Sequence, residues 1–456
     1  MKILPIILLL AGFGYQTASA QSATDRDERR AAIDTIVKAY GDVYGFAGTV
    51  LVVDDEQPLI QTSIGLADRA FGIANTATTR NSINSISKTF TALAVVRMAE
   101  RGRIELDAAI GRYLPALKAE WRNRVTVHHL LSHSSGLPRE AGLDSHDRQT
   151  LEQQLDDVAQ LTLLFEPGQR FGYSNAGYIL LGNLLEAVSG TTYAEIIEQE
   201  ILKPLKLENT GVYEGRVVVA NQAEPYRMTP RGVERAQRTK TLGETAGGGL
   251  YSTATDLYRY TRALENNALL SDDMQKMLFA RHVTGEGSDY EGYAWSIKQF
   301  GDQTLRFAAG SGYGTKSVII RDPQQGQFIG IVSNWGNTPI LQLLRDIYLS
   351  VKGQDIQPPS STMLAKPSNH RAQLGSYAFD AETLRTALQI IDGELRLHVH
   401  EGKLFLDDEL LVAGPDGTLA LTYTDELVIR LDGDCMTLEI GGQSLKGTRI
   451  RQPGGQ

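Results

Sequence analysis

Ser85 and Lys88 lie three residues apart in the stretch SINSISKTFTALAVVRM, where a polar segment becomes apolar. A serine hydroxyl is a poor nucleophile until a neighbouring amine or phenolate takes its proton. If a helix begins at about Ser85, the two side chains share one face and the ammonium reaches the hydroxyl. The helix N-terminus would also favour an oxyanion beside Ser85. The plainer alternative is a capping serine followed by an exposed lysine.

A second polar group precedes another apolar segment. Tyr173, Ser174 and Asn175 stand directly before the amphipathic run AGYILLGNLLEAVSG. The plain alternative for Tyr173 is a buried aromatic ring whose hydroxyl is hydrogen-bonded.

The elements that must position these residues follow from hydrophobic periodicity. Residues 28–40 have helical spacing, and FAGTVLVVDDEQPLIQTSIG predicts two strands around a polar turn. Residues 82–280 are mostly helical in pattern, whereas TLRFAAGS, TKSVIIRD and GQFIGIVSN predict strands before a closing helix PILQLLRDIYLSVKG. The sheet should therefore take strands from both ends of this region, around an inserted helical portion. After a linker, period-two alternation over 371–450 predicts a small antiparallel barrel or sandwich.

Five stretches together resemble the serine β-lactamase-related family, which includes class C β-lactamases, D-alanyl-D-alanine carboxypeptidases and other penicillin-binding proteins. They are SISKTFTA, HLLSHSSGLP, EPGQRFGYSNAGYILLG, ILKPLKLENTG and GGGLYSTATDLYRY, in the family's order over most of residues 30–350. The resemblance implies an α/β (α+β) fold, with an antiparallel sheet flanked by helices and an all-helical portion. We expect a signal peptide at 1–20, this hydrolase domain at 21–353, a linker at 354–370 and a barrel at 371–456.

The resemblance also implies roles for individual residues. Ser85 would be the acylated nucleophile, Lys88 its partner, and Tyr173 the general base. Asn175 would donate to the carbonyl or amide of the substrate. A phenol acts as a base near neutrality only if a neighbouring cation stabilises the phenolate, which Lys88 is placed to do.

The sequence departs from the family at the third motif, where members usually carry Lys or His, a small residue and Gly. The equivalent residues here are Gly310, Ser311 and Gly312, or Ala309, Gly310 and Ser311 in another register. The missing cation argues against strong β-lactamase or carboxypeptidase activity. A third motif without the cation resembles that of the esterase, aminopeptidase and oligoamide-hydrolase branches of the family. A second oxyanion N–H would come from near Tyr313. Lys316 follows on what we take to be the same strand, too far along to replace the cation.

Other features limit the function. The start MKILPIILLLAGFGYQTASA has the pattern of a signal peptide with a small-residue cleavage site, which predicts export, by expectation to a bacterial periplasm, without stable membrane insertion. A net charge of -9 without a basic face argues against a nucleic-acid partner. The single cysteine, Cys435, excludes an internal disulfide.

Two sharper hypotheses are set aside. His129 and His133 have the spacing of helical zinc ligands, but Leu130 stands where H-E-x-x-H requires glutamate. The run Gly247–Gly249 lacks the G-K-[ST] of a phosphate loop, so close packing beside the site is the better interpretation. We therefore expect neither a metal nor an organic cofactor.

The sequence thus predicts an exported serine hydrolase that cleaves an ester or amide bond of a small-molecule or peptide-like acyl substrate through an acyl-enzyme on Ser85. One alternative is a penicillin-binding D-alanyl-D-alanine carboxypeptidase or weak class C-like β-lactamase. A second is a hydrolase-like binding module without turnover. The identity of the substrate and the oligomeric state stay open.

Overall fold

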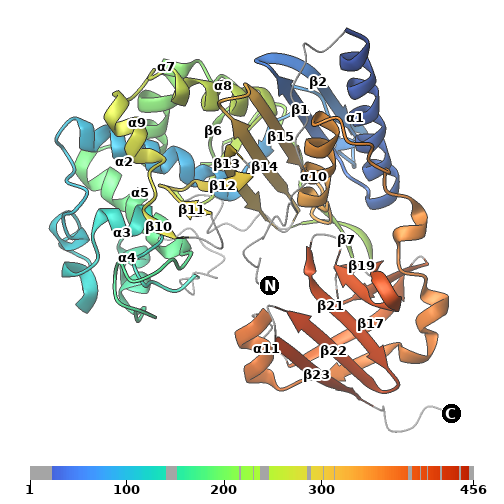
Figure 1. The fold of residues 1–456 in the computed structure, drawn as a ribbon. Coiled ribbons are helices and arrows are strands. Elements are labelled where there is room, and N and C mark those ends of the chain that lie inside the picture. The colour runs from blue at the N-terminus through green and yellow to red at the C-terminus, as the bar shows by residue number, and fades with distance from the viewer. Residues whose placement is uncertain are drawn as a thin grey trace.

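The computed structural model describes most of the chain in two parts, a mixed helix-and-sheet part and a carboxy-terminal barrel (Figure 1). The described ranges are 23–139, 151–214, 217–229, 231–236, 246–284, 289–300, 302–312, 314–388, 393–400, 402–407, 409–421, 424–440 and 443–450. The expected signal peptide lies outside these residues. The predicted α/β fold with a terminal barrel is confirmed.

The central sheet is antiparallel and has the strand order β10-β11-β12-β13-β14-β15-β1-β2. Its strands are β1 (Gly48–Asp54), β2 (Gln57–Ile64), β10 (Val283–Thr284), β11 (Tyr290–Glu291), β12 (Ser296–Phe300), β13 (Gln303–Ser311), β14 (Lys316–Asp322) and β15 (Gln327–Ser333). Strand β1 pairs with β15 along its length, so the two ends of this region meet in one sheet as predicted. Strands β1 and β14 are buried at every position because helices cover both faces.

Helices α1 (Ala23–Tyr44) and α10 (Ile340–Val351) pack together on one face of this sheet (Figure 1). Their apolar side chains form one core with alternate residues of the strands, among them Val50, Val318 and Ile331. Because β-strand side chains alternate between faces, residues of the other parity face the helical portion.

The helical portion lies on the opposite side of the sheet (Figure 1). Its helices are α2 (Ser87–Glu100), α3 (Val127–Leu131), α4 (Leu151–Ala159), α5 (Asn175–Ser189), α6 (Tyr193–Ile197), α7 (Lys203–Leu205), α8 (Ala254–Glu265) and α9 (Asp272–Leu278). Short strands interrupt it: β3 (Leu66–Asp68), β4 (Ile73–Ala74), β5 (Asn81–Ser82), β6 (Gly211–Val212), β7 (Tyr226–Thr229), β8 (Gly232–Arg235) and β9 (Leu250–Ser252). Within the described ranges, no helix has both the length and the apolar character needed to cross a bilayer.

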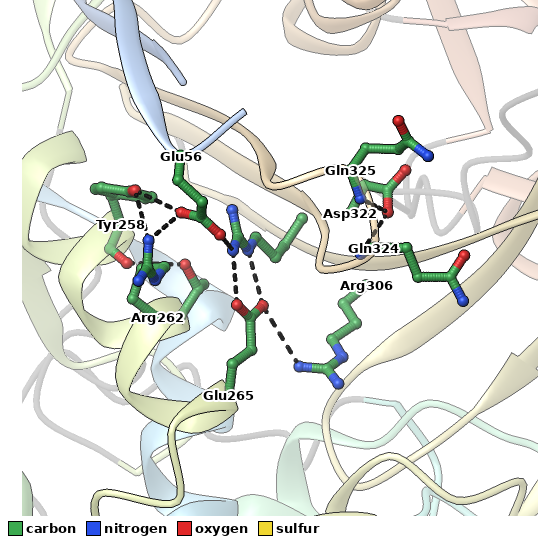
Figure 2. Close-up of polar contacts among 10 residues, drawn as sticks. Glu56, Tyr258, Arg262, Glu265, Arg306, Asp322, Gln324 and Gln325 are labelled. Atoms are coloured by element: carbon green, nitrogen blue, oxygen red, sulfur yellow. Dashed lines mark hydrogen bonds and ion pairs between the residues drawn. The ribbon is translucent and has the colours of Figure 1, made fainter. Parts of the chain in front are cut away.

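A buried charge network ties α8 to the sheet (Figure 2). Arg321 of β14 is 1% exposed and donates to Glu265 of α8 at 2.6 and 2.7 Å and to Glu56 of the β1–β2 turn at 2.5 Å. Glu56 also accepts from Tyr258 at 2.9 Å and pairs with Arg262. Helix α8 is therefore fixed by ion pairs as well as by apolar packing.

The carboxy-terminal residues form a closed antiparallel barrel, the first of the two predicted options. Its strands are β16 (Gly375–Ala378), β17 (Glu394–His400), β18 (Lys403–Leu406), β19 (Glu409–Ala413), β20 (Leu419–Leu421), β21 (Thr424–Asp432), β22 (Cys435–Ile440) and β23 (Gln443–Arg449). Helix α11 (Ala381–Leu388) follows the first strand and was not anticipated. The barrel touches the rest of the protein where β19 lies against β7 (Figure 1).

Candidate active site

Ser85 lies in a 3-10 turn, Asn84–Ile86, immediately before α2, rather than on the α-helix itself. Asn84 has a φ of +46°, a left-handed conformation that asparagine tolerates better than most residues. Its side-chain Nδ2 donates to Thr315 Oγ1 at 3.0 Å, and its Oδ1 accepts from Ser82. These bonds fix the backbone turn that presents Ser85 at the start of α2.

The Ser85 hydroxyl is bracketed by the two predicted partners. Lys88 Nζ lies 3.3 Å from Ser85 Oγ, and the Tyr173 hydroxyl lies 2.9 Å from the same atom. Lys88 Nζ is also 5.0 Å from the centre of the Tyr173 ring. The fold therefore brings together Ser85 and Tyr173, which are 88 positions apart in the sequence.

Lys88 is 2% exposed, and its ammonium is surrounded by neutral oxygen atoms. Besides the Ser85 hydroxyl, it donates to Asn175 Oδ1 at 2.9 Å and to the Gly247 carbonyl at 2.5 Å. Among the residues that the structure describes, no carboxylate forms an ion pair with it. Its charge is thus solvated by dipoles and directed at the serine and tyrosine hydroxyls.

His133 supports Tyr173 from behind. The two rings are stacked with centroids 4.4 Å apart, and His133 Nδ1 accepts from the Ser174 backbone N–H at 3.1 Å. Burial holds the pKa of His133 well below its usual value, and the nearby Lys88 and Arg139 charges act in the same direction. The imidazole is therefore neutral, with Nδ1 as acceptor, and it orients the tyrosine backbone and ring.

Helix α5 begins directly after Tyr173 and supplies the remaining motif residues. Ser174 is its N-cap, since its Oγ accepts from the Gly177 N–H at 3.2 Å. Asn175 is 6% exposed, and its Oδ1 is taken up by Lys88. Its expected contact with the substrate stays a prediction, whereas its contact with the lysine is part of the structure.

The run Gly247–Gly249 lies beside the site, as expected from close packing. It leads into β9, whose Leu250 pairs through its backbone with Ile83 and donates to Ser87 Oγ at 3.0 Å. Because Gly247 brings its carbonyl to Lys88, this segment also serves the ammonium directly.

The structure explains why residue 310 is a glycine. A Cβ atom placed on Gly310 would lie 2.1 Å from the Ile83 carbonyl oxygen and 2.9 Å from the Ser85 nitrogen. These are backbone atoms of the nucleophile turn, so no side chain fits there without moving the turn. Gly310 is thus required for close approach of β13 to Ser85.

The expectation for Lys316 was wrong about its strand. Strand β13 ends at Ser311, and Lys316 opens the next strand, β14, directly opposite Ser311. Its Nζ donates to Ser311 Oγ at 2.5 Å. Gly312 follows Ser311 and packs near the Asn84 side chain. Tyr313, the predicted source of a second oxyanion N–H, lies outside the described residues.

The two histidines of the zinc hypothesis have other tasks. His129 Nδ1 accepts from the Thr126 N–H in a capping box at the start of α3, while His133 supports Tyr173. Over the described ranges, no group of three or more His, Cys, Asp or Glu side chains is arranged to hold a metal ion.

Sequence reasoning overlooked Asn84, and it treated His133 only as a possible metal ligand. Asn84 carried one usable signal, because asparagine before a helix start is typical of a left-handed turn residue. His133 also has a positive φ of 55°, but no local pattern indicates that its ring stacks on Tyr173.

Comparisons with known proteins identify the family of the chain. The family model described as Beta-lactamase matches residues 33–349. Penicillin-binding protein 4* of Bacillus subtilis is 28% identical over 320 residues, which cover 65% of this chain and 70% of that protein. Protein flp of Staphylococcus aureus is 24% identical over 331 residues, which cover 69% of this chain and 65% of that protein. The match thus spans about two thirds of the length of these curated relatives.

Solved structures show the same fold. A penicillin binding protein from Bacillus halodurans, 28% identical, superposes with a TM-score of 0.62 over 70% of this chain and 98% of its own. An octameric penicillin-binding protein homologue from Pyrococcus abyssi, 22% identical, gives 0.66 over 92% of this chain and 96% of its own. Because the family model covers more than half of the sequence, the chain belongs to the beta-lactamase family of serine hydrolases.

Proposed function

We propose that the protein hydrolyses an ester or amide bond through an acyl-enzyme on Ser85. The observation that carries this proposal is the position of the Ser85 hydroxyl, 2.9 Å from the Tyr173 hydroxyl and 3.3 Å from the Lys88 ammonium. Both are within the reach expected of groups that exchange a proton with a nucleophile.

In the proposed first step, Ser85 Oγ forms a bond to the acyl carbon while its proton passes to the Tyr173 oxygen. Lys88 stabilises the negative charge of the tyrosine before this transfer. The bond from the acyl carbon to the leaving group then breaks, and the leaving group takes the proton from Tyr173. In the second step, water gives a proton to Tyr173 and its oxygen forms a bond to the same carbon. The bond from this carbon to Ser85 Oγ then breaks, the acid leaves, and Ser85 Oγ takes the proton from Tyr173.

The oxyanion needs N–H donors placed before the reaction begins. The Ser85 amide nitrogen stands against Gly310 of β13 and ahead of the N-terminus of α2. We assign it as one donor, with the second from the backbone that follows Gly312.

The absence of Lys and His from residues 309–312 favours esters and uncharged amides over substrates that need a carboxylate held by a cation there. The signal-like start of the sequence supports action outside the bacterial cytoplasm. A mature protein that begins at Gln21 in a periplasmic extract would support this placement, whereas an intact Met1 in the cytoplasm would contradict it.

The decisive measurement is the intact mass of the mature protein after exposure to a fluorophosphonate and, separately, to a penicillin. We expect one fluorophosphonate adduct that Ser85→Ala abolishes and that Ser189→Ala, at the far end of α5, leaves intact. The reaction with the fluorophosphonate tests the nucleophile without assuming the natural substrate. No adduct with either reagent would contradict the proposal and favour a binding module without turnover.

A second candidate is a penicillin-binding carboxypeptidase or weak β-lactamase. It is favoured by the relatives named penicillin-binding proteins, at 28% identity. A stable penicillin adduct on Ser85 would support it, and rapid loss of that adduct with opening of the lactam would indicate β-lactamase turnover.

A further inference from the structure

Lys316 is a buried lysine that the proposed reaction does not use. It is 9% exposed, and its Nζ donates to the hydroxyl of Ser311 on the neighbouring strand. By strand alternation it shares a face of the sheet with Val318 and Ile320, which pack in the core formed with α1 and α10. This is the face opposite to the one on which Gly310 meets Ser85.

The barrel reaches this face of the sheet. Val412 of β19 belongs to the same apolar core as Val318 and Ile320, and β19 runs against β7. Glu409 is the first residue of β19. Besides burial, which lowers the pKa of Lys316, the charge of Glu409 raises this pKa and the charge of Arg227 on β7 lowers it.

Ser311 is the last residue of the strand that touches the nucleophile turn. Its neighbour Gly310 packs on the Ser85 nitrogen, and Gly312 donates its N–H to the Thr315 carbonyl at 2.9 Å. On the side of the active site, Asn84 holds this turn through Thr315. On the other side, the bond from Lys316 to Ser311 holds it.

We propose that the carboxy-terminal barrel completes the active site from behind: Glu409 is the counter-charge of Lys316, Lys316 anchors Ser311, and Ser311 fixes the strand end beside Ser85. Lys316 is in this view a positioning residue, since it acts through Ser311. The inference rests on the proposed function and gives the barrel a part in it.

A double-mutant cycle on the two anchored side chains tests the proposal. We expect Lys316→Met and Ser311→Ala each to lower kcat for a p-nitrophenyl acyl ester by about tenfold with little change in KM, because a misplaced strand end affects the transition state more than binding. The double variant should lose no more than the worse single variant, since both remove one anchor. Lys352→Met, a partly buried lysine bonded to Gln327, is the matched control and should keep full kcat.

The pH profile separates this role from a merely structural one. Burial lowers the pKa of Lys316 to about 8, Glu409 opposes this shift, and Arg227 adds to it. The bond to Ser311 is charge-assisted while Lys316 is protonated and weakens as the pH rises through that value. Glu409→Gln removes the opposing charge, so the alkaline fall in kcat should move to lower pH, whereas Glu439→Gln on β22 should not move it.

The outcomes distinguish this inference from the proposed function. If the wild-type protein takes no fluorophosphonate on Ser85, the proposed function fails and the inference with it. If the wild type is labelled and turns over ester, but the Lys316 and Ser311 variants match Lys352→Met or lose activity additively, only the inference is overturned. Should Lys316→Met fail to fold, Ser311→Ala and Glu409→Gln carry the same test with smaller changes.

Discussion

Two buried cations, Arg321 of β14 and Lys88 of α2, are solvated in different ways. Arg321, 1% exposed, is held by the carboxylates of Glu56 and Glu265. Lys88, 2% exposed, is held by a hydroxyl, an amide oxygen and a backbone carbonyl. Each side chain carries one positive charge, but of the two only Arg321 has carboxylate partners among the described residues.

In the Arg321 network, each charged side chain lies beside one of opposite charge. Burial raises the pKa of Glu56, yet the bonds from Arg321 and Tyr258 and the charges of Arg321 and Arg262 outweigh it, so the pKa ends below its usual value. Burial lowers the pKa of Arg321, and the bonds to Glu265 more than reverse this. Each charge stabilises its partner, so no proton is easily exchanged at neutral pH.

The site around Lys88 differs from the Arg321 network in its electrostatics, because this ammonium donates to neutral oxygen atoms. Among the described residues the buried Lys88 ammonium has no carboxylate partner, which is costly, and none of their carboxylates pairs with it to cancel its field. That field acts on the hydroxyls of Ser85 and Tyr173, the two groups that must exchange a proton in the proposed reaction. We therefore expect the first region to contribute to stability and the second to activity.

The largest expected effect is that of Lys88→Met. The value of kcat/KM should fall by about 10³-fold, within the usual range for loss of acid–base assistance. The free energy of unfolding should change by less than about 2 kcal/mol, since the unpaired acceptors left behind are offset by removal of a desolvated charge. Ester turnover and urea unfolding check the two values, and full activity would refute the comparison.

Arg321→Met should show the reverse pattern. Removing one member of a buried ion pair leaves uncompensated carboxylates, so the free energy of unfolding should fall by about 3 kcal/mol. The kcat of the fraction that stays folded should change little. The control is Arg345→Met, because Arg345 is a half-exposed arginine that pairs with Asp346. An equal loss of unfolding free energy in this control would contradict a special role of the Arg321 ion pairs in stability.

The same change, Tyr to Phe, made once in each region compares their effects on activity and on stability. Tyr173→Phe should lower kcat/KM by about 10²-fold and leave unfolding nearly unchanged. Tyr258→Phe, which deletes the bond to Glu56, should cost ~1 kcal/mol of stability and leave kcat/KM unchanged. Both quantities are measured for both variants, and any exchange of the two phenotypes would contradict the assignment.

Glu291 is an intermediate case: its carboxylate is half-buried, accepts from the Ser296 hydroxyl and forms no ion pair with any other described residue. Burial raises its pKa to about 7, although bonds from Ser296 and the charge of Lys298 oppose this. The folded protein then binds this proton more tightly than the unfolded chain, so stability falls as the pH rises from 4.5 towards 7. Between pH 5 and pH 8 the wild type should lose about 2 kcal/mol more free energy of unfolding than the Glu291→Gln variant. Parallel pH dependences in wild type and variant would contradict this.

The fold was predictable to a large extent. The alternation and apolar runs located β1, β2, β13, β14, β15 and α10, and period two located the barrel. Local patterns carry this information because side-chain burial follows strand and helix periods. Helix α11 was missed because it is a short helix within a run of strands, and the alternating pattern around it did not indicate a helix.

The candidate site was predictable only in its parts. The types and spacing of Ser85, Lys88, Tyr173 and Asn175 marked them, and the structure places all four within one hydrogen-bonded group. The strand of Lys316 was misjudged: this residue was placed on the strand of the third motif, although the run TKSVIIRD that contains it was itself predicted as a strand and glycines precede that run.

The sequence by itself determined which side chains are available for chemistry and which segments form helices and strands. The tertiary structure alone decided that neutral oxygen atoms of the described residues surround the Lys88 ammonium, that no side chain fits at Gly310 beside Ser85, and that Lys316 meets Ser311. The physical reason is that charge environment and close approach depend on atoms from segments far apart in the chain. Periodicity records which face of an element is buried, but it does not record what that face meets.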